Sequence, residues 1–258
     1  MPSSAGADQP PRSIWSVAAE ALGRPYPVTA SMVVLVGLVP FYIFIPELVS
    51  QEAARSLDTA VDRLFPLAPA WAIVYGAFYL FLILLPVLLI RDLEHVRRTV
   101  RAYLAVWLTA YGCFILYPTI APRPAAFSAH GFGGWGLSLL YAADIRYNCF
   151  PSLHVAHSFV SALTSGRLHR GVGRFALLAA SLVALSTLYT KQHYAVDVGA
   201  GILLAVLAHR LFLRSYRPSG PGVRDAEAAP VVSMLLLGAL AVATACAWLV
   251  YASTTAQK

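Results

Sequence analysis

Residues 68–90 read APAWAIVYGAFYLFLILLPVLLI, an apolar run that contains no charged side chain. A bilayer core about 30 Å thick needs roughly 20 residues of helix, and backbone groups inside lipid must bond within that helix. The run therefore predicts a transmembrane helix. The whole chain agrees with this prediction, because 59% of its 258 residues are hydrophobic and 12% are charged, which is too apolar for a soluble domain of this length.

Six further spans complete the expected fold, which is an all-α polytopic membrane helix bundle. The shortest span is mildly polar and is predicted because Pro151 and Ser152 form a helix start. A cytoplasmic tail (1–27) precedes a six-helix membrane domain (28–214), and a cytoplasmic linker with a seventh, C-terminal transmembrane helix follows (215–258). The expected spans are 28–45, 68–90, 102–117, 152–165, 175–190, 194–212 and 231–251.

The charges in the connecting loops set the expected orientation. Basic loops are retained on the cytoplasmic side of a membrane, so we expect a cytoplasmic N-terminus in an integral protein of a bacterial-type cell membrane. The net charge of +7 is spread over short loops, and no nucleic-acid partner is expected. The arginines assigned to the cytoplasmic side are Arg12, Arg24, Arg91, Arg97, Arg98, Arg101, Arg167, Arg170, Arg174, Arg210, Arg214, Arg217 and Arg224.

Two candidate catalytic residues lie four positions apart at the start of the sixth span. His193 and Asp197 are expected to share a helix face, so that the carboxylate accepts the imidazole N–H. This contact fixes the tautomer and leaves the other ring nitrogen free to attack or to accept a proton. An aspartate inside a membrane protein is costly and is usually functional.

His154 and Ser152 lie at the start of the fourth span, on the same side of the membrane as His193. Ser152 can cap this helix, and the free backbone N–H groups of a helix start favour an anion. His154 lies in the first turn, where it can donate a proton to a leaving oxygen.

Two cations flank these polar segments on the outer side. Arg123 stands between Pro122 and Pro124, which restrict the local backbone, and a guanidinium held in this way suits phosphate oxygens. Lys191 is a second candidate. Either cation can instead anchor the protein to lipid headgroups.

A metal site made of His154, His157, His193 and Asp197 has weak support, because His157 lies deeper in its span. We expect neither a metal nor a cofactor. The three cysteines show no metal-ligand spacing, and no disulfide is expected. The histidines expected to be solvated on the cytoplasmic side are His95, His169 and His209.

Three outer segments resemble, in their order, the motifs of the type 2 phosphatidic acid phosphatase superfamily. They are Arg123-Pro124, Phe150-Pro-Ser-Leu-His154, and the segment from Ser186 that ends in Gln192-His-Tyr-Ala-Val-Asp197. The last two look most like the inositol phosphorylceramide synthase branch. The resemblance covers about residues 30–212, and it implies a six-helix bundle with its site at the extracytoplasmic surface.

The resemblance also implies a role for each candidate residue. His193 would attack phosphorus and form a phosphohistidine, Asp197 would orient it, and His154 would protonate the leaving group. Ser152 and Arg123 would hold phosphate oxygens.

Two cations of the phosphatase motifs are absent from this chain. Leu116 stands where the phosphatase pattern has a lysine, seven residues before the arginine. The last motif begins Ser186-Thr187 where the pattern has Ser-Arg. Lys191, two residues before His193, is a candidate replacement.

Together these features predict a metal-independent lipid phosphotransferase or phosphatase that acts on a phosphorylated lipid at the outer leaflet. Water, or a hydroxyl of a second lipid or a polyol, would resolve the intermediate, so the residues leave hydrolysis and transfer open. The alternative is a non-catalytic lipid-binding or transport protein that uses the same polar cluster as a proton relay or an anion site.

Overall fold

The computed structural model describes residues 13–23, 37, 39–48 and 51–255. Within these residues the protein is helical, and its only β contacts are two isolated bridges, from Arg55 to Thr119 and from Thr119 to Asn148. The elements, in chain order, are α1 (Ile14–Leu22), α3 (Val39–Leu48), η1 (Gln51–Ala53), η2 (Ala60–Leu64), α4 (Trp71–Leu89), α5 (Leu93–Leu116), α6 (Gly131–Ala143), α7 (Leu153–Leu168), α8 (Arg170–Tyr189), α9 (Ala195–Ala208), η3 (His209–Leu213) and α10 (Pro221–Thr255).

Five helices in this part of the chain are long and apolar enough to cross a bilayer: α4, α5, α8, α9 with the π-turn η3, and α10. The expected all-α polytopic bundle is therefore confirmed. Of the first expected span, residues 28–36 and 38 lie outside the described residues, and α3 covers its final part.

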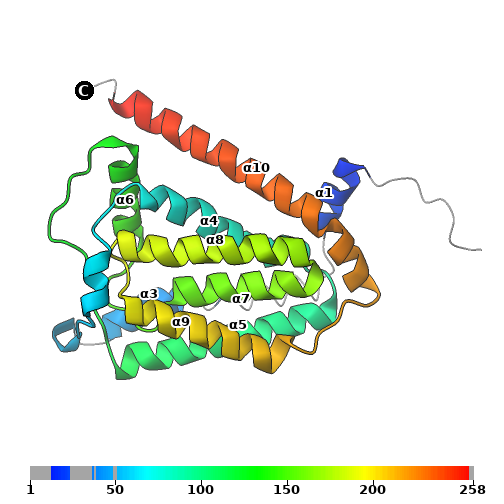
Figure 1. Cartoon of the computed structure of the whole chain (residues 1–258), viewed down its shortest axis with the longest axis horizontal. Coiled ribbons are helices and arrows are strands. Elements are labelled where there is room, and N and C mark those ends of the chain that lie inside the picture. Colours follow the sequence, from blue (N-terminus) through cyan, green and yellow to red (C-terminus); the bar gives the residue numbers. More distant parts are fainter. Residues whose placement is uncertain (1–12, 24–36, 38, 49–50, 256–258) are drawn as a thin grey trace, which may run out of the picture.

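The short helix α7 lies at the centre of the bundle, where it packs against α4, α5, α8 and α9 (Figure 1). It corresponds to the expected span 152–165, and its small and polar residues suit a position surrounded by protein. Ser161 donates to the carbonyl of Leu82 in α4 at 2.6 Å, so a buried hydroxyl finds its partner across the helix interface. One side of α7 packs into a core with α4, α8 and α10, and the other into a core with α5 and α9.

A close approach between α7 and α9 depends on Gly201. A Cβ atom at this position would lie 2.6 Å from the carbonyl oxygen of Ser152 and 3.3 Å from the amide of Ala156. Glycine therefore lets α9 approach the first turn of α7. The two helix starts that carry the candidate residues are held side by side for this reason.

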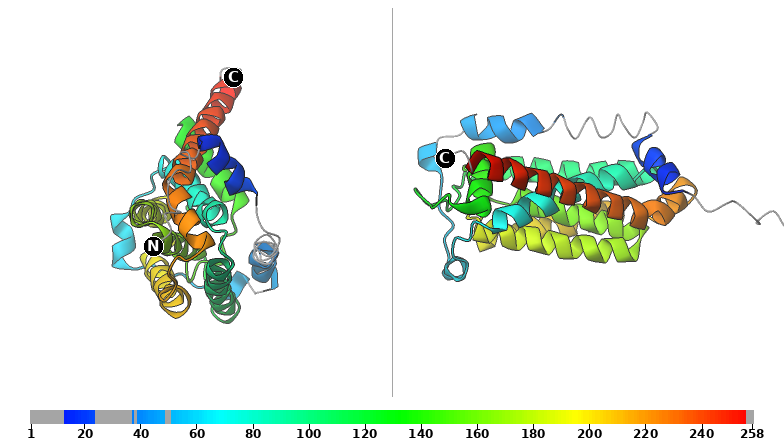
Figure 2. Two further views of the ribbon diagram at one scale, coloured as in Figure 1. Left: turned by 90° about the vertical axis from the view of Figure 1, so that its right-hand side faces the viewer. Right: turned by 90° about the horizontal axis from the view of Figure 1, so that it is seen from above.

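Two helices differ from the sequence-based prediction. The loop after the third span contains α6, a helix that the sequence analysis did not predict. The last helix begins at Pro221 instead of residue 231 and crosses the outside of α4. Figure 2 shows its C-terminal end beside α6, where Tyr251 contacts the rings of Phe132 and Trp135.

The end of the bundle opposite α6 gathers basic side chains and a second polar network. Asp225 of α10 accepts hydrogen bonds from the backbone amides of Arg91 and Asp92, at 2.8 and 2.9 Å. His95 was expected to be solvated, but it is fully buried and stacks on Tyr216 with 4.0 Å between ring centroids. The prediction failed because Tyr216, in the turn between η3 and α10, covers His95 from a distant part of the chain.

Candidate active site

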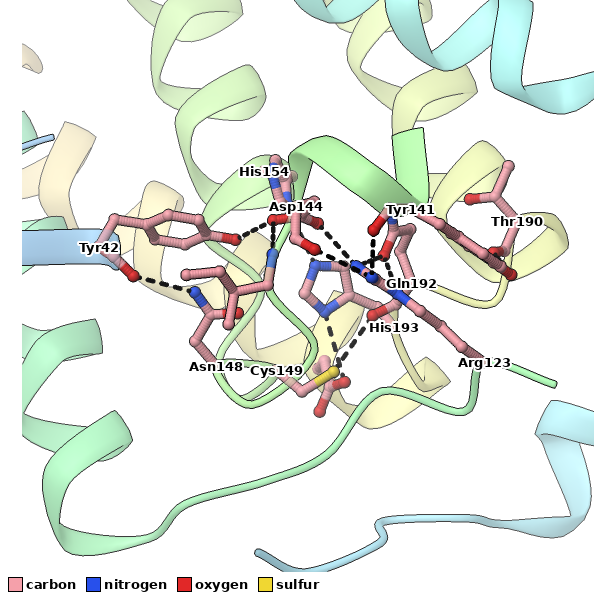
Figure 3. A network of polar contacts seen from close by, with 12 residues as sticks. Tyr42, Arg123, Tyr141, Asp144, Asn148, Cys149, His154, Thr190, Gln192 and His193 are labelled. Atoms are coloured by element: carbon pink, nitrogen blue, oxygen red, sulfur yellow. Dashed lines mark hydrogen bonds and ion pairs between the residues drawn. The ribbon is translucent and has the colours of Figure 1, made fainter. Parts of the chain in front are cut away.

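Three of the predicted residues form one connected chain of contacts at the α6 end of the bundle. His154 comes from the start of α7, whereas His193 and Asp197 come from the start of α9. Figure 3 shows these elements and the neighbouring loops converging on the two imidazoles. The structure thus brings together the histidines that the sequence placed at two separate helix starts.

The two histidines contact each other directly. Nδ1 of His154 lies 3.2 Å from Nε2 of His193, and both side chains are buried. If Nδ1 of His193 carries its proton toward Asp197, then Nε2 has the free lone pair and His154 is the donor. The rings of Tyr75 and Tyr79 meet the His154 ring edge-on at 5.5 and 5.1 Å, which fixes its orientation.

Asp197 lies beside the other nitrogen of His193. Its Oδ2 atom is 3.5 Å from Nδ1 of His193 and accepts a hydrogen bond from the amide of Tyr194 at 2.9 Å. The two residues do not share a helix face as predicted, because α9 begins at Ala195 and His193 precedes it. Instead, the turn into the helix brings them together. Oδ1 of Asp197 and Nδ1 of His193 are buried and make no hydrogen bond to any described residue.

Ser152 is the N-cap of α7, as the sequence predicted. Its hydroxyl accepts from the amide of Val155 at 3.3 Å, and its own amide donates to the carbonyl of Asp197 at 3.1 Å. The start of α7 is therefore tied to the start of α9. Its amide end, which favours an anion, lies next to the histidines.

Arg123 is held by groups that the sequence analysis did not identify. Its guanidinium donates to Oε1 of Gln192 through Nε at 2.9 Å, and also through an Nη atom. It donates to the carbonyl of Asp144 at 2.9 Å and lies 3.3 Å from the carboxylate of that residue. It also lies over the ring of Tyr141, with 4.8 Å to the centroid. Arg123 thereby connects the loop after α6 to the residue before His193.

Asp144 is itself anchored from a third direction. The hydroxyl of Tyr42 in α3 donates to its Oδ1 atom at 2.7 Å, and the amide of Ile145 donates to the same atom at 3.0 Å. The side chains of Arg123 and Asp144 are 8% and 10% exposed, so this ion pair lies largely out of water. The sequence contains one signal for this ion pair, because Asp144 is an acidic residue between two polar motifs. Nothing in the sequence indicates that its partner is Arg123.

Lys191 points toward the loop before α4. Its ammonium donates to the carbonyl of Asp62 at 3.3 Å, and its backbone takes the left-handed conformation with φ of 55°. The carboxylate of Asp62 accepts from the amide of Ala195 at 2.7 Å and so holds the same loop to the start of α9. Burial raises the pKa of Asp62, but hydrogen bonds from Thr59 and Ala195 outweigh it and leave the pKa below its usual value.

The two positions where phosphate-binding cations were expected have different surroundings. Leu116 is 84% exposed at the end of α5 and faces outward. Thr187 is fully buried, and its carbonyl accepts the amides of Gln192 and His193 at 2.9 and 3.3 Å. Thr187 therefore helps to shape the turn that carries His193.

His157 does not join the site. Its ring lies 4.4 Å from that of Tyr103 and also contacts Tyr79 and Trp107 deeper in the bundle.

The structure instead brings Cys149 to the site, where the thiol donates to the carbonyl of Gln192 at 3.1 Å. Burial and the nearby charge of Asp197 raise the pKa of this thiol well above its usual value. All three cysteines are free thiols.

Comparisons with known proteins identify the family of this chain. The family model described as the PAP2 superfamily matches residues 52–211. A PA-phosphatase related-family protein of Dictyostelium discoideum is 25% identical over 137 residues, which cover 49% of this chain and 25% of that protein. The chain thus spans about a quarter of the length of this relative. No solved structure matches this chain. The matched region contains the two helix starts, both histidines and Asp197, and the chain belongs to the PAP2 superfamily.

Proposed function

We propose that this membrane protein transfers the phosphoryl group of a phosphorylated lipid through a phosphohistidine on His193, at the extracytoplasmic face. The observation that carries the proposal is the contact chain from His154 through His193 to Asp197, with separations of 3.2 and 3.5 Å. A nucleophile, the base or acid beside it and a group that orients it are the parts that covalent catalysis requires.

In the first step, Nε2 of His193 attacks phosphorus and the bond from phosphorus to the lipid oxygen breaks. Asp197 holds the proton on Nδ1 and stabilises the positive charge that develops on the ring. His154, which carries a proton on both ring nitrogens in this step, gives its Nδ1 proton to the departing oxygen and is left neutral. The phosphoryl group would therefore enter between the two rings and replace their direct contact.

In the second step, an acceptor hydroxyl gives its proton to His154 and attacks phosphorus, and the bond from phosphorus to Nε2 breaks. The acceptor is water in a phosphatase, and a second lipid or a polyol in a phosphotransferase. Both outcomes use the same residues, so the products distinguish them.

The proposed phosphate cradle consists of Arg123, Ser152 with the start of α7, and Gln192. Because Arg123 only donates hydrogen bonds, the amide oxygen of Gln192 must face it. The Nε2 atom of Gln192 is buried and bonds to no described residue, which leaves a donor for a phosphate oxygen. A phosphate would compete with Asp144 for Arg123. Lys191 would have to leave the Asp62 carbonyl to add its charge.

The charge distribution supports the proposed orientation. The turns at the end of the bundle opposite α6 carry the arginines around α5, between α7 and α8, and after α9. Basic ends are retained in the cytoplasm, which would leave the histidines facing outward.

The decisive experiment is a panel of lipid phosphates with the purified full chain in detergent, reading phosphate release and new lipid products in parallel. His193→Asn should lower turnover by about 10³-fold or more, because the covalent route is lost. A labelled substrate should leave acid-labile phosphate on the native chain but not on the variant. Turnover should persist in EDTA.

His209→Asn is the matched control, because His209 lies at the far end of α9. It should retain native turnover and native labelling. Substantial turnover by His193→Asn would refute the mechanism. The absence of both turnover and labelling across the panel would favour the lipid-binding or transport alternative.

A further inference from the structure

Three potential metal ligands surround the side of His193 that faces away from His154. Sγ of Cys149, a ring nitrogen of His193 and a carboxylate oxygen of Asp197 all lie within 4.8 Å of one another, and all three residues are buried. Figure 3 shows the thiol of Cys149 beside the His193 ring. The sequence did not indicate this group, because Cys149 lies far from His193 along the chain and shows no metal-ligand spacing.

We propose that Cys149, His193 and Asp197 form an inhibitory binding site for a borderline-soft divalent cation such as Zn²⁺. Sulfur, imidazole nitrogen and carboxylate oxygen are the donor types that zinc prefers. Three protein ligands would leave a fourth position for water.

The spacing of the donor atoms suits such an ion. Ligand distances of about 2.0–2.3 Å place tetrahedral donors roughly 3.3–3.7 Å apart. Nδ1 of His193 and Oδ2 of Asp197 already have that separation, at 3.5 Å. The thiol is within 4.8 Å of a ring nitrogen of His193 and a carboxylate oxygen of Asp197, so a small side-chain rotation would complete the set.

Two unpartnered atoms point independently to a ligand here. Nδ1 of His193 and Oδ1 of Asp197 are buried and bond to none of the described residues. Buried polar atoms without a well-formed hydrogen bond are costly, and a cation held by Nδ1 and one carboxylate oxygen would bond both residues. A thiolate and a carboxylate would also neutralise the two charges of the ion, which favours its burial.

Binding of the cation and catalysis would exclude each other. The metal would take the lone pair of Nδ1 of His193, so the ring proton would move to Nε2, and the thiol proton would be released to solvent. A protonated Nε2 has no lone pair with which to attack phosphorus, and Asp197 would no longer face an N–H. The inhibition rests on the proposed role of His193, whereas cation binding does not.

The test uses ZnCl₂ as inhibitor and CoCl₂ as spectroscopic probe on the purified full chain. The double variant Cys113→Ala/Cys246→Ala retains Cys149 as its only thiol, and the two altered residues lie outside the site. In this variant Co²⁺ should produce a thiolate charge-transfer band in the near ultraviolet, and Zn²⁺ should inhibit turnover reversibly with EDTA. Cys149→Ser should not show the band. When inhibition is expressed relative to the zinc-free rate of each variant, Cys149→Ser should need about 10–100-fold more zinc for half-inhibition than the double variant. Mg²⁺ should have neither effect.

The possible outcomes separate this proposal from the proposed function. A Co²⁺ band in the double variant supports the site even if no lipid is turned over. Turnover without any band in the double variant overturns the site and leaves the function intact. Equal zinc inhibition of Cys149→Ser and the double variant also overturns it, because the zinc then acts on the substrate or elsewhere.

Discussion

Two buried aspartates, one at each end of the bundle, differ in how fully their oxygens are bonded. Oδ2 of Asp225 accepts two backbone amides, and Oδ1 is in ion-pair contact with Arg91, 3.3 Å from its Nε atom. Asp197 accepts one backbone amide on Oδ2, faces His193 with the same atom, and leaves Oδ1 without a partner in the described part of the chain. We propose that the carboxylate of Asp225 fixes structure, whereas that of Asp197 acts in the chemistry.

The same contrast extends to the groups around each carboxylate. Asp225 joins the start of α10 to the turn between α4 and α5, a purely architectural connection. Asp197 joins a helix start to an imidazole that contacts a second imidazole. Burial of a charge is costly at either end of the bundle. We therefore expect the loss of Asp225 to lower stability and the loss of Asp197 to lower turnover.

The largest expected effect is on catalysis, from Asp197→Ala. Turnover should fall by roughly 10²–10⁴-fold, because His193 loses the group that sets its tautomer and stabilises its positive form. Stability should fall by only about 1 kcal/mol, because one backbone donor loses its acceptor. Turnover per folded molecule, measured together with the thermal unfolding midpoint in detergent, checks both expectations. Retained turnover would remove Asp197 from the mechanism.

Asp225→Ala is the matched substitution at the other end and should show the reverse pattern. Removing the carboxylate leaves two backbone amides and Arg91 without this acceptor, so the free energy of unfolding should fall by about 3 kcal/mol. Turnover per folded molecule should stay within a few-fold of native. If the variant instead lost turnover while keeping its unfolding midpoint, the contrast between the two ends would be wrong.

A smaller effect is expected from Gly201→Ala, which tests how α7 and α9 hold the site. The new Cβ would meet the Ser152 carbonyl at 2.6 Å and push the helix starts apart, at a cost of about 1–3 kcal/mol. Turnover should fall about tenfold, because Ser152 and Asp197 are joined through their backbones.

Gly199→Ala is the control for this substitution, because a Cβ there meets no atom within 4 Å. It should leave turnover unchanged and stabilise α9 by up to about 1 kcal/mol, since alanine favours a helix more than glycine does. Equal behaviour of the two variants in both assays would show that the close approach does not position the site.

Features that depend on neighbouring residues could be predicted from the amino-acid sequence. Long apolar runs require helices because lipid offers no partners for the backbone, and this gave the polytopic all-α fold. The cap at Ser152 and the proximity of His193 to Asp197 are also local, because one helix start sets each of them. The family motifs added an expected role for each residue but did not fix its contacts.

Contacts between distant groups, in contrast, depend on how the helices pack. The tertiary structure placed α7 at the centre, brought Asp144 and Gln192 to Arg123, and set Cys149 beside the paired histidines. It also buried His95, which was expected to be solvated because of its place in a cytoplasmic loop. These contacts depend on how the helices pack and on the close approach that Gly201 permits. The residue pattern within one helix does not indicate which part of another helix will pack against it.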